Sequence, residues 1–111
     1  MEFAEALEVI SQTFVANSIR RDTAACAAAY SEDVEYVFSM SRSLKGRDAL
    51  RKAFDELPPV TFLETLWQDS SGDMGCCIQR GECGGDFHVM LVFRKQQDGS
   101  LEVIREVDLI V

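Results

Sequence analysis

An arginine and several carboxylates lie at spacings that could support acid–base chemistry. Arg80 and Glu82 are two residues apart, and Glu106 and Asp108 repeat that spacing near the C-terminus. An arginine between two acids can hold one carboxyl protonated as a general acid and the other ionised as a base for water. Arg80, Glu82 and Glu106 are therefore the candidate catalytic residues, with the Tyr36 hydroxyl assisting.

The same charges have a structural alternative. A salt-bridge network that closes one end of a sheet uses the same residue types, and charge clusters that perturb pKa values are often structural. In this alternative Arg80 pairs with Asp108 at the rim of the sheet, and Glu82 lies in solvent. The sequence leaves both alternatives open.

The cysteines do not indicate a metal site. The segment Gly75–Gly85, GCCIQRGECGG, holds three of the four cysteines, and His88 is the only histidine in the chain. The cysteines show neither CxxC spacing nor a second ligand cluster, whereas a structural zinc usually needs four ligands. We therefore expect no metal and no cofactor, with the thiols filling a sheet. The cysteines are Cys26, Cys76, Cys77 and Cys83.

Composition limits the classes of protein that the chain can represent. Its 111 residues, with 47% hydrophobic and 27% charged content, predict a single domain over residues 1–111. The net charge of -8 would repel nucleic acid and anionic membrane surfaces. No stretch approaches the ~20 apolar residues of a membrane span, and the N-terminus lacks the basic region of a signal peptide. We expect no nucleic-acid or membrane partner and a cytoplasmic location.

The first half of the chain predicts three helices and one strand. Phe3, Leu7, Ile10 and Phe14 recur at helical spacing, and alanines favour a second, short helix. Pro58 stops the third helix. The predicted elements are a helix over 3–19, a short helix over 23–30 with Asp22 as its N-cap, a strand over 34–38 and a helix over 46–57.

The second half predicts an antiparallel meander with a defined register. Gly84-Gly85 and Asp98-Gly99 are typical of two-residue hairpin turns. The four predicted strands cover 60–69, 73–83, 86–96 and 101–110. Counting from the turns places Arg80 opposite Val89, Ile78 opposite Leu91, Val89 opposite Asp108, and Leu91 opposite Glu106.

Both faces of this sheet are too apolar to meet water. We expect the helices to cover the face with the aromatic residues and a second copy of the chain to cover the other. The predicted homodimer face carries Met90, Val92, Val103, Val107 and Leu109. The helix-covered face and the inward helix stripes enclose a pocket for a small apolar or amphipathic molecule. Its predicted lining is Phe14, Tyr36, Phe38, Phe54, Cys76, Ile78, Leu91 and Ile104, with Asp108 at the rim.

The order of these elements resembles a known superfamily. The segments FVANSIRRDTAACAAAYSEDVEYVF, KGRDALRKAF and DGSLEVIREVDLIV look like those of the cone-shaped α+β superfamily of nuclear transport factor two and SnoaL-like proteins. The resemblance implies three N-terminal helices packed on a strongly curved, mostly antiparallel sheet with an interior pocket. Members include isomerases, dehydratases, epoxide hydrolases, ring cyclases, binding proteins and dimerisation modules, so the fold does not fix the function.

Two enzyme types of this superfamily can be compared residue by residue. The catalytic positions of the steroid isomerases, a mechanism used as a general example of pKa tuning, fall on Phe14, Phe38 and about Leu91, which carry no titratable group. The resemblance to limonene-type epoxide hydrolases is better, since Arg80 with Glu82 and Glu106 occupies the places of their arginine and two acids. Tyr36 matches a water-orienting tyrosine, but Phe38 replaces the neighbouring asparagine.

Three functional hypotheses follow. The leading one is a small-molecule-binding domain with a largely apolar pocket. The second is an epoxide hydrolase or related acid–base enzyme, and the third is a homodimerisation module without a ligand.

Overall fold

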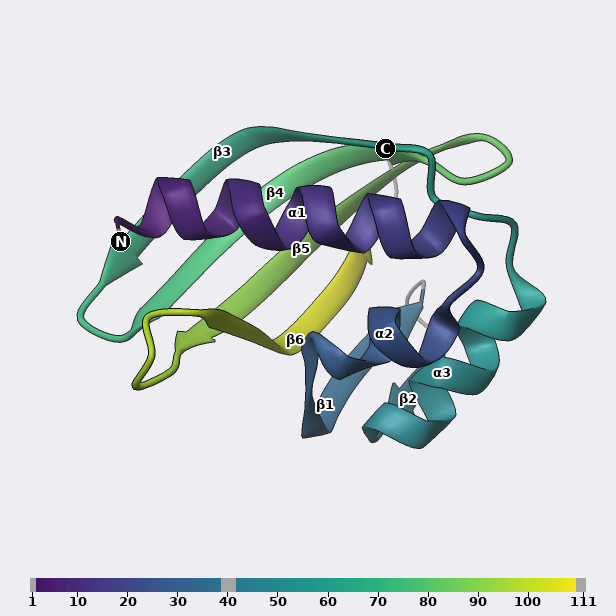
Figure 1. Cartoon of the computed structure of the whole chain (residues 1–111), viewed down its shortest axis with the longest axis horizontal. Coiled ribbons are helices and arrows are strands. Elements are labelled where there is room, and N and C mark those ends of the chain that lie inside the picture. The colour runs from purple at the N-terminus through teal and green to yellow at the C-terminus, as the bar shows by residue number, and fades with distance from the viewer. Residues whose placement is uncertain (1, 39–41, 110–111) are drawn as a thin grey trace.

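The computed structural model describes residues 2–38 and 42–109 as three helices and six strands (Figure 1). The elements in chain order are α1 (Phe3–Ile19), α2 (Thr23–Ala28), β1 (Tyr30–Phe38), β2 (Arg42–Lys45), α3 (Arg47–Glu56), β3 (Phe62–Ser71), β4 (Met74–Glu82), β5 (Asp86–Lys95) and β6 (Leu101–Leu109). Ile110, the predicted end of the last strand, lies outside the described residues. Among the described residues, none of the helices has the length and apolar character of a membrane span.

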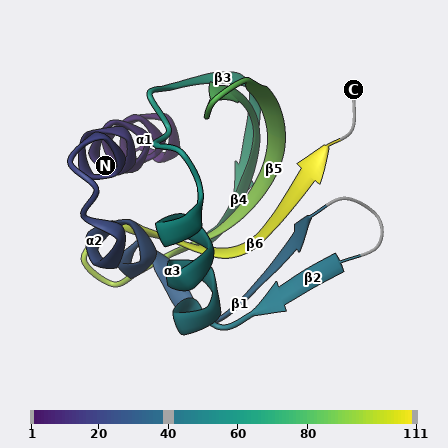
Figure 2. The same cartoon turned by 90° about the vertical axis from the view of Figure 1, so that its right-hand side faces the viewer.

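The strands form one curved, unclosed sheet in the order β2-β1-β6-β5-β4-β3. Neighbouring strands are antiparallel except for β1 and β6, which run parallel. The sheet curls around α1, which lies across its concave side, while α2 and α3 pack together near β1 (Figure 2). All three helices therefore lie on one face of the sheet, which we call the inner face, and the other is the outer face.

The three helices lie where the sequence predicts, although α2 ends two residues before its predicted end and α3 is one residue shorter at each end. The α1 helix spans Phe3–Ile19, and Ala6 and Leu7 of its apolar stripe are buried. The Asp22 carboxylate accepts a hydrogen bond from the Ala25 backbone N–H, which confirms it as the N-cap of α2. The α3 helix ends at Glu56, two residues before the first proline.

The prediction that all three helices are N-terminal was wrong in one respect. The α3 helix follows β1 and β2, so two strands separate it from α2. The β1 strand begins at Tyr30, four residues earlier than predicted, because the residues assigned to the tail of the second helix pair with β6. The β2 strand was not predicted, because its four residues include a single apolar side chain, Leu44, and so show no alternation.

The predicted register between β4 and β5 was wrong by one residue. Cys83 joins Gly84 and Gly85 in a three-residue loop, closed by a hydrogen bond of 2.8 Å from the Cys83 N–H to the Gly85 carbonyl. Arg80 consequently lies opposite His88 instead of Val89. Side chains alternate along a strand, so this shift moves every β4 side chain to the other face.

The register between β5 and β6 is as predicted near the acidic residues. Val89 lies opposite Asp108, and Leu91 lies opposite Glu106. An irregularity at Val92–Phe93 then places Val103 opposite Phe93. Val103 is therefore on the inner face, with 4% of its surface exposed, and does not belong to the predicted dimer face.

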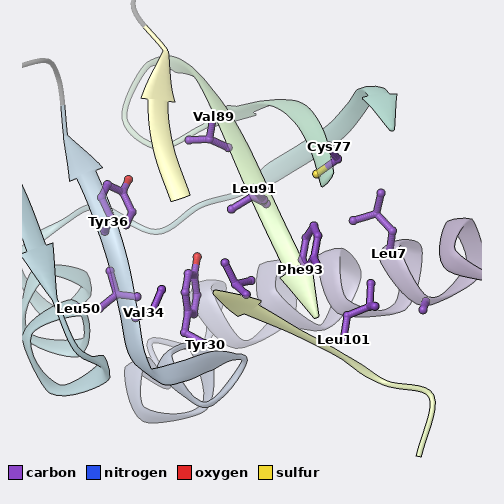
Figure 3. Packing of buried hydrophobic residues seen from close by; sticks show 12 residues of the cluster. Leu7, Tyr30, Val34, Tyr36, Leu50, Cys77, Val89, Leu91, Phe93 and Leu101 are labelled. Atoms are coloured by element: carbon purple, nitrogen blue, oxygen red, sulfur yellow. The ribbon is translucent and has the colours of Figure 1, made fainter. Parts of the chain in front are cut away.

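Two glycines of β4 make room for aromatic rings on the inner face. A Cβ atom at Gly75 would lie 2.2 Å from the Phe3 ring, and one at Gly81 would lie 2.4 Å from the Phe87 ring. Gly75 is also paired with Phe93, whose ring meets Phe3 edge-on at 6.0 Å between centroids. These contacts attach the first turn of α1 to the sheet. Figure 3 shows Phe93 beside Leu7 of α1 in the same core.

Candidate functional site

A hollow of about 290 Å³ lies between the helices and the inner face of the sheet. Among the residues predicted to bind a ligand, several line it from α1, α3, β1, β5 and β6. These are Phe14, Phe54, Tyr36, Phe38, Leu91 and Asp108. Ser11, Tyr30, Gln79, Val89 and Glu106 also contribute to the wall. The lining is mostly apolar, and its carboxyl groups belong to Asp86, Glu106 and Asp108.

Three predicted lining residues are placed elsewhere. Cys76 and Ile78 alternate with the buried Cys77 and Gln79 of β4, so they lie on the outer face. The one-residue register shift accounts for both. Ile104 is buried, but it is the residue left unpaired at the irregularity between Val103 and Arg105, and it does not line the hollow.

The polar end of the hollow is built from two carboxyls and two tyrosines. The Tyr30 hydroxyl donates a hydrogen bond of 2.6 Å to Glu106 Oε1, and the Tyr36 hydroxyl donates one of 2.9 Å to Asp108 Oδ1. Tyr36 also lies close enough to Glu106 to affect the pKa of its carboxyl. The parallel pairing of β1 with β6, which places Tyr36 opposite Glu106, brings these residues together. We call these four residues the acidic cluster.

Burial dominates the electrostatics of the acidic cluster. Glu106 has only 6% of its surface exposed, and this desolvation raises the pKa of its carboxyl to about 7. The hydrogen bonds from Tyr30 and Tyr36 oppose the shift, and the nearby charge of Asp108 adds to it. Burial also raises the pKa of Asp108 and of both tyrosines, so the phenols remain protonated donors. A carboxyl that titrates near neutrality can both donate and accept a proton there.

The two carboxyls of the acidic cluster titrate as a pair. The Tyr36 hydroxyl has a single hydrogen, which it donates to Asp108. The nearby charge of Asp108 raises the pKa of Glu106, so the pH at which either carboxyl loses its proton depends on the protonation state of the other.

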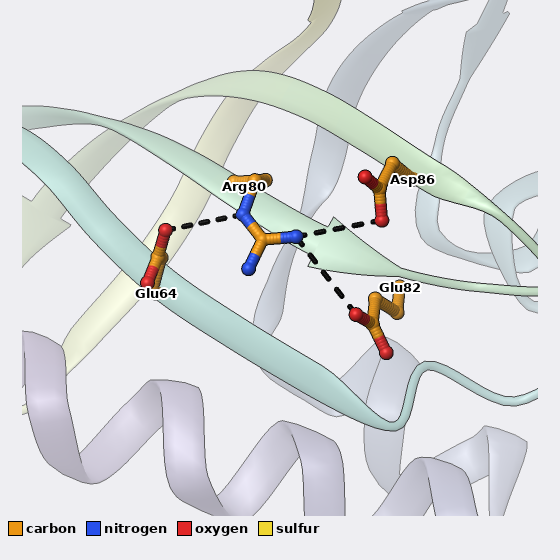
Figure 4. Close-up of polar contacts among 4 residues, drawn as sticks. All are labelled: Glu64, Arg80, Glu82 and Asp86. Atoms are coloured by element: carbon orange, nitrogen blue, oxygen red, sulfur yellow. Dashed lines mark hydrogen bonds and ion pairs between the residues drawn. The ribbon is translucent and has the colours of Figure 1, made fainter.

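Arg80 and Glu82 lie on the outer face, away from the hollow (Figure 4). Arg80 Nε is 3.1 Å from Glu64 Oε1, and its Nη1 is 3.4 Å from Asp86 Oδ1 and 3.8 Å from Glu82 Oε1. The guanidinium carbon is 5.1 Å from the centre of the Phe62 ring. These partners are partly exposed, so the group resembles a surface salt-bridge network.

The four predicted catalytic residues are thus divided between the two faces. Tyr36 and Glu106 line the hollow, while Arg80 and Glu82 are on the other side of the sheet. The alternative pairing of Arg80 with Asp108 is not formed either, since Asp108 accepts from Tyr36. The register of β4 places Arg80 on the outer face, which separates it from both Glu106 and Asp108.

The described residues contain no group of three histidine, cysteine, aspartate or glutamate side chains that could hold a metal ion. All four cysteines are free thiols. Burial raises the pKa of Cys77 to about 12, so this thiol stays protonated and packs as a small apolar residue.

Two residues of the site were missed by sequence reasoning. Tyr30 falls at the end of the helix predicted over 23–30, but it begins β1, and its hydroxyl donates to Glu106. Gln79 follows Ile78, a predicted lining residue, so the predicted register puts it on the outer face, but it lines the hollow and is 1% exposed. A signal for the correct register was present, because it sets Gly75 opposite Phe93 and Gly81 opposite Phe87. Glycines paired with aromatic residues are a recurrent arrangement in sheets.

No protein-family model matches the chain, and no curated protein matches it. Solved structures do resemble it. An NTF-2 like protein of unknown function from Silicibacter pomeroyi superposes with a TM-score of 0.80 at 20% identity, over 100% of both chains. One from Shewanella oneidensis has a TM-score of 0.82 at 12% identity, over 95% of this chain and 97% of that one.

A ketosteroid isomerase-like protein from Erwinia carotovora has a TM-score of 0.69 at 17% identity, over 96% of each chain. Identities this low establish the arrangement of the backbone and leave the chemistry open. The resemblance of its sequence predicted three helices on a curved, mostly antiparallel sheet, and with these helices on one face of a six-stranded sheet the chain has the NTF2-like fold.

Proposed function

We propose that the protein binds a small, mostly apolar molecule in the hollow, with one polar group of that molecule at the acidic cluster. The observation that carries this proposal is the position of Glu106, a buried carboxyl on the wall of an otherwise largely apolar hollow. Ligand sites typically combine an apolar lining with a few convergent polar groups, often with perturbed pKa values.

The geometry limits the guest. A hollow of about 290 Å³ is near the lower end of the range for small-molecule sites, which favours a guest of one or two rings. Protonated Glu106 would donate a hydrogen bond to a carbonyl or hydroxyl oxygen. The net charge of -8 and the paired carboxyls disfavour an anionic guest.

Binding can be tested with the neutral two-ring fluorescent probe 6-propionyl-2-(dimethylamino)naphthalene. We expect the wild type to bind it, with enhanced fluorescence, and Leu91→Trp to weaken binding at least about tenfold, because the indole would occupy the hollow. Fluorescence titration gives both dissociation constants. Arg94→Trp, on the exposed part of the same strand, is the matched control and should bind like the wild type. A wild type that does not bind the probe would favour a module without a ligand.

We further propose a homodimer through the outer face. One row of paired residues across it is apolar: Trp67, Ile78, Met90, Val107 and Val37. Charged residues of both signs flank this row, among them Arg80 with its acids and Arg105 with Glu35. A second copy turned by a two-fold axis would bury the apolar rows together and leave the charges at the rim, as in known interfaces.

A charge in the middle of the apolar row should break this dimer. We expect the wild type to scatter light with about twice the 12.4 kDa mass of one chain. Val107→Glu should raise the dimer dissociation constant at least about 100-fold, because the carboxylate would be buried without a partner. Val9→Glu, at a valine 54% exposed on α1, is the matched control. A monomeric wild type at micromolar concentration would contradict the dimer.

A further inference from the structure

A glutamine in the wall of the hollow has an unpaired amide oxygen. Gln79 lies in the middle of β4 and is 1% exposed. Its Nε2 donates hydrogen bonds to Ser11 Oγ at 2.9 Å and to Thr65 Oγ1 at 3.3 Å, which uses both of its hydrogens. Its Oε1 is buried and has no hydrogen-bond partner among the described residues.

The two neighbouring hydroxyls explain why the amide has this orientation. If the amide were turned over, Oε1 would accept from the Ser11 and Thr65 hydroxyls, and the two hydrogens of Nε2 would then need acceptors. The observed orientation pairs both hydrogens and leaves one oxygen without a partner. The amide oxygen of Gln79 is therefore the group that is left to accept a hydrogen bond.

An unpaired amide oxygen in a protein interior needs an explanation. Buried polar groups are nearly always hydrogen-bonded, because leaving one unpaired costs free energy. A leucine or methionine at this position would bury no unpaired amide oxygen. The side chain also lies on the wall of a hollow, where a guest could supply the missing donor.

The register of the sheet sets Gln79 apart from the acidic cluster. Gln79 pairs with Val89, and Val89 pairs with Asp108, so the three side chains share one row on the inner face. One strand separates Gln79 from Asp108, and the backbones are therefore about 10 Å apart. Val89 and Leu91 form the apolar wall between the two polar positions.

We propose that Gln79 is a second polar contact for the guest and accepts a hydrogen bond from its O–H or N–H. Because Oε1 is buried in the free protein, binding needs a rotation about the terminal torsion, which is soft in glutamine, to turn this oxygen toward the guest. The inference rests on the proposed binding function and narrows the ligand class. The guest is a flat or elongated apolar molecule with an acceptor, such as a carbonyl, for the acidic cluster and a hydroxyl or amine at its opposite end.

Three naphthalenes of nearly equal shape test this proposal: 6-hydroxy-2-acetonaphthone, 6-methoxy-2-acetonaphthone and 2-acetonaphthone. Titrations at pH 6 keep most of Glu106 protonated, since its pKa is about 7. We expect the hydroxy compound to bind the full chain about tenfold more tightly than the methoxy compound, which cannot donate. In Gln79→Met this preference should fall to within about twofold.

The matched control is Gln12→Met, at an exposed glutamine of α1 that bonds to Glu8 and does not line the hollow. It should keep the tenfold preference. Thermal melting checks that Gln79→Met is folded, and Gln79→Asn, with an amide one methylene shorter, is a second variant that should lose the preference. Equal binding of the three compounds by the wild type, or a preference that persists in Gln79→Met, would contradict the role of Gln79 and leave the proposed binding function in place. Binding of none of them would overturn the proposed function as well.

Discussion

Glu106→Gln is expected to raise the free energy of unfolding by about 3 kcal/mol at pH 8 and to change it little at pH 4. The carboxyl has a pKa of about 7 in the folded protein, against an ordinary value of 4.5. The difference between these pKa values corresponds to about 3 kcal/mol. The glutamine amide is neutral at every pH and still offers an oxygen to the Tyr30 hydroxyl.

The folded state binds the proton of Glu106 more tightly than the unfolded state does. A carboxyl whose pKa is raised by folding contributes stability below pH 4.5, and this contribution is lost as the pH rises through 7. Urea unfolding from pH 4 to pH 8 should therefore show wild type and variant diverging over this range. Glu32→Gln, at an exposed residue of β1, should run parallel to the wild type. A Glu106→Gln profile that also runs parallel would show that Glu106 is not desolvated as described.

Phe93→Ala is expected to lower the free energy of unfolding by about 3–5 kcal/mol, because it removes a ring that is 1% exposed. The ring packs edge-on against Phe3 beside Gly75, so its loss would also release the first turn of α1. Urea or thermal unfolding measures the effect.

Phe62→Ala is the matched control for this deletion. Phe62 lies on the outer face with 37% of its surface exposed and is in contact with Arg80. Its removal should cost about 1 kcal/mol or less. Equal losses from the two variants would mean that the inner face is not the principal core.

The helices were predictable because their signals are local. The apolar stripe of α1, the cap at Asp22 and the proline after α3 each act within a few residues, and all three hold in the structure. The short β2 strand could not be predicted in this way. It is a strand because β1 pairs with it, and its own side chains do not require it.

The candidate site depended on loop geometry, which the sequence specifies less well. Asp98-Gly99 gave the correct register for Glu106 and Asp108, whereas Gly84-Gly85 allowed two loops that differ by one residue. That single residue separates Arg80 from Glu106 and brings Gln79 into the hollow. Glu106 and Asp108 of β6 line the hollow, and their register with β5 is the predicted one. The hydrogen bond from Tyr30 to Glu106 could not be predicted, because it depends on the parallel pairing of β1 with β6, which are far apart in the sequence.

The parallel pairing of β1 with β6 has a consequence for the order in which the protein forms. The hydrogen bond between Tyr30 and Glu106 joins residues 76 positions apart, and that between Tyr36 and Asp108 joins residues 72 apart. A ribosome adding about 5–20 residues per second needs roughly 4–15 s to cover such a separation. The growing chain can form α1 and the first strand within that time, but the polar end of the hollow can be completed only after the last strand has emerged.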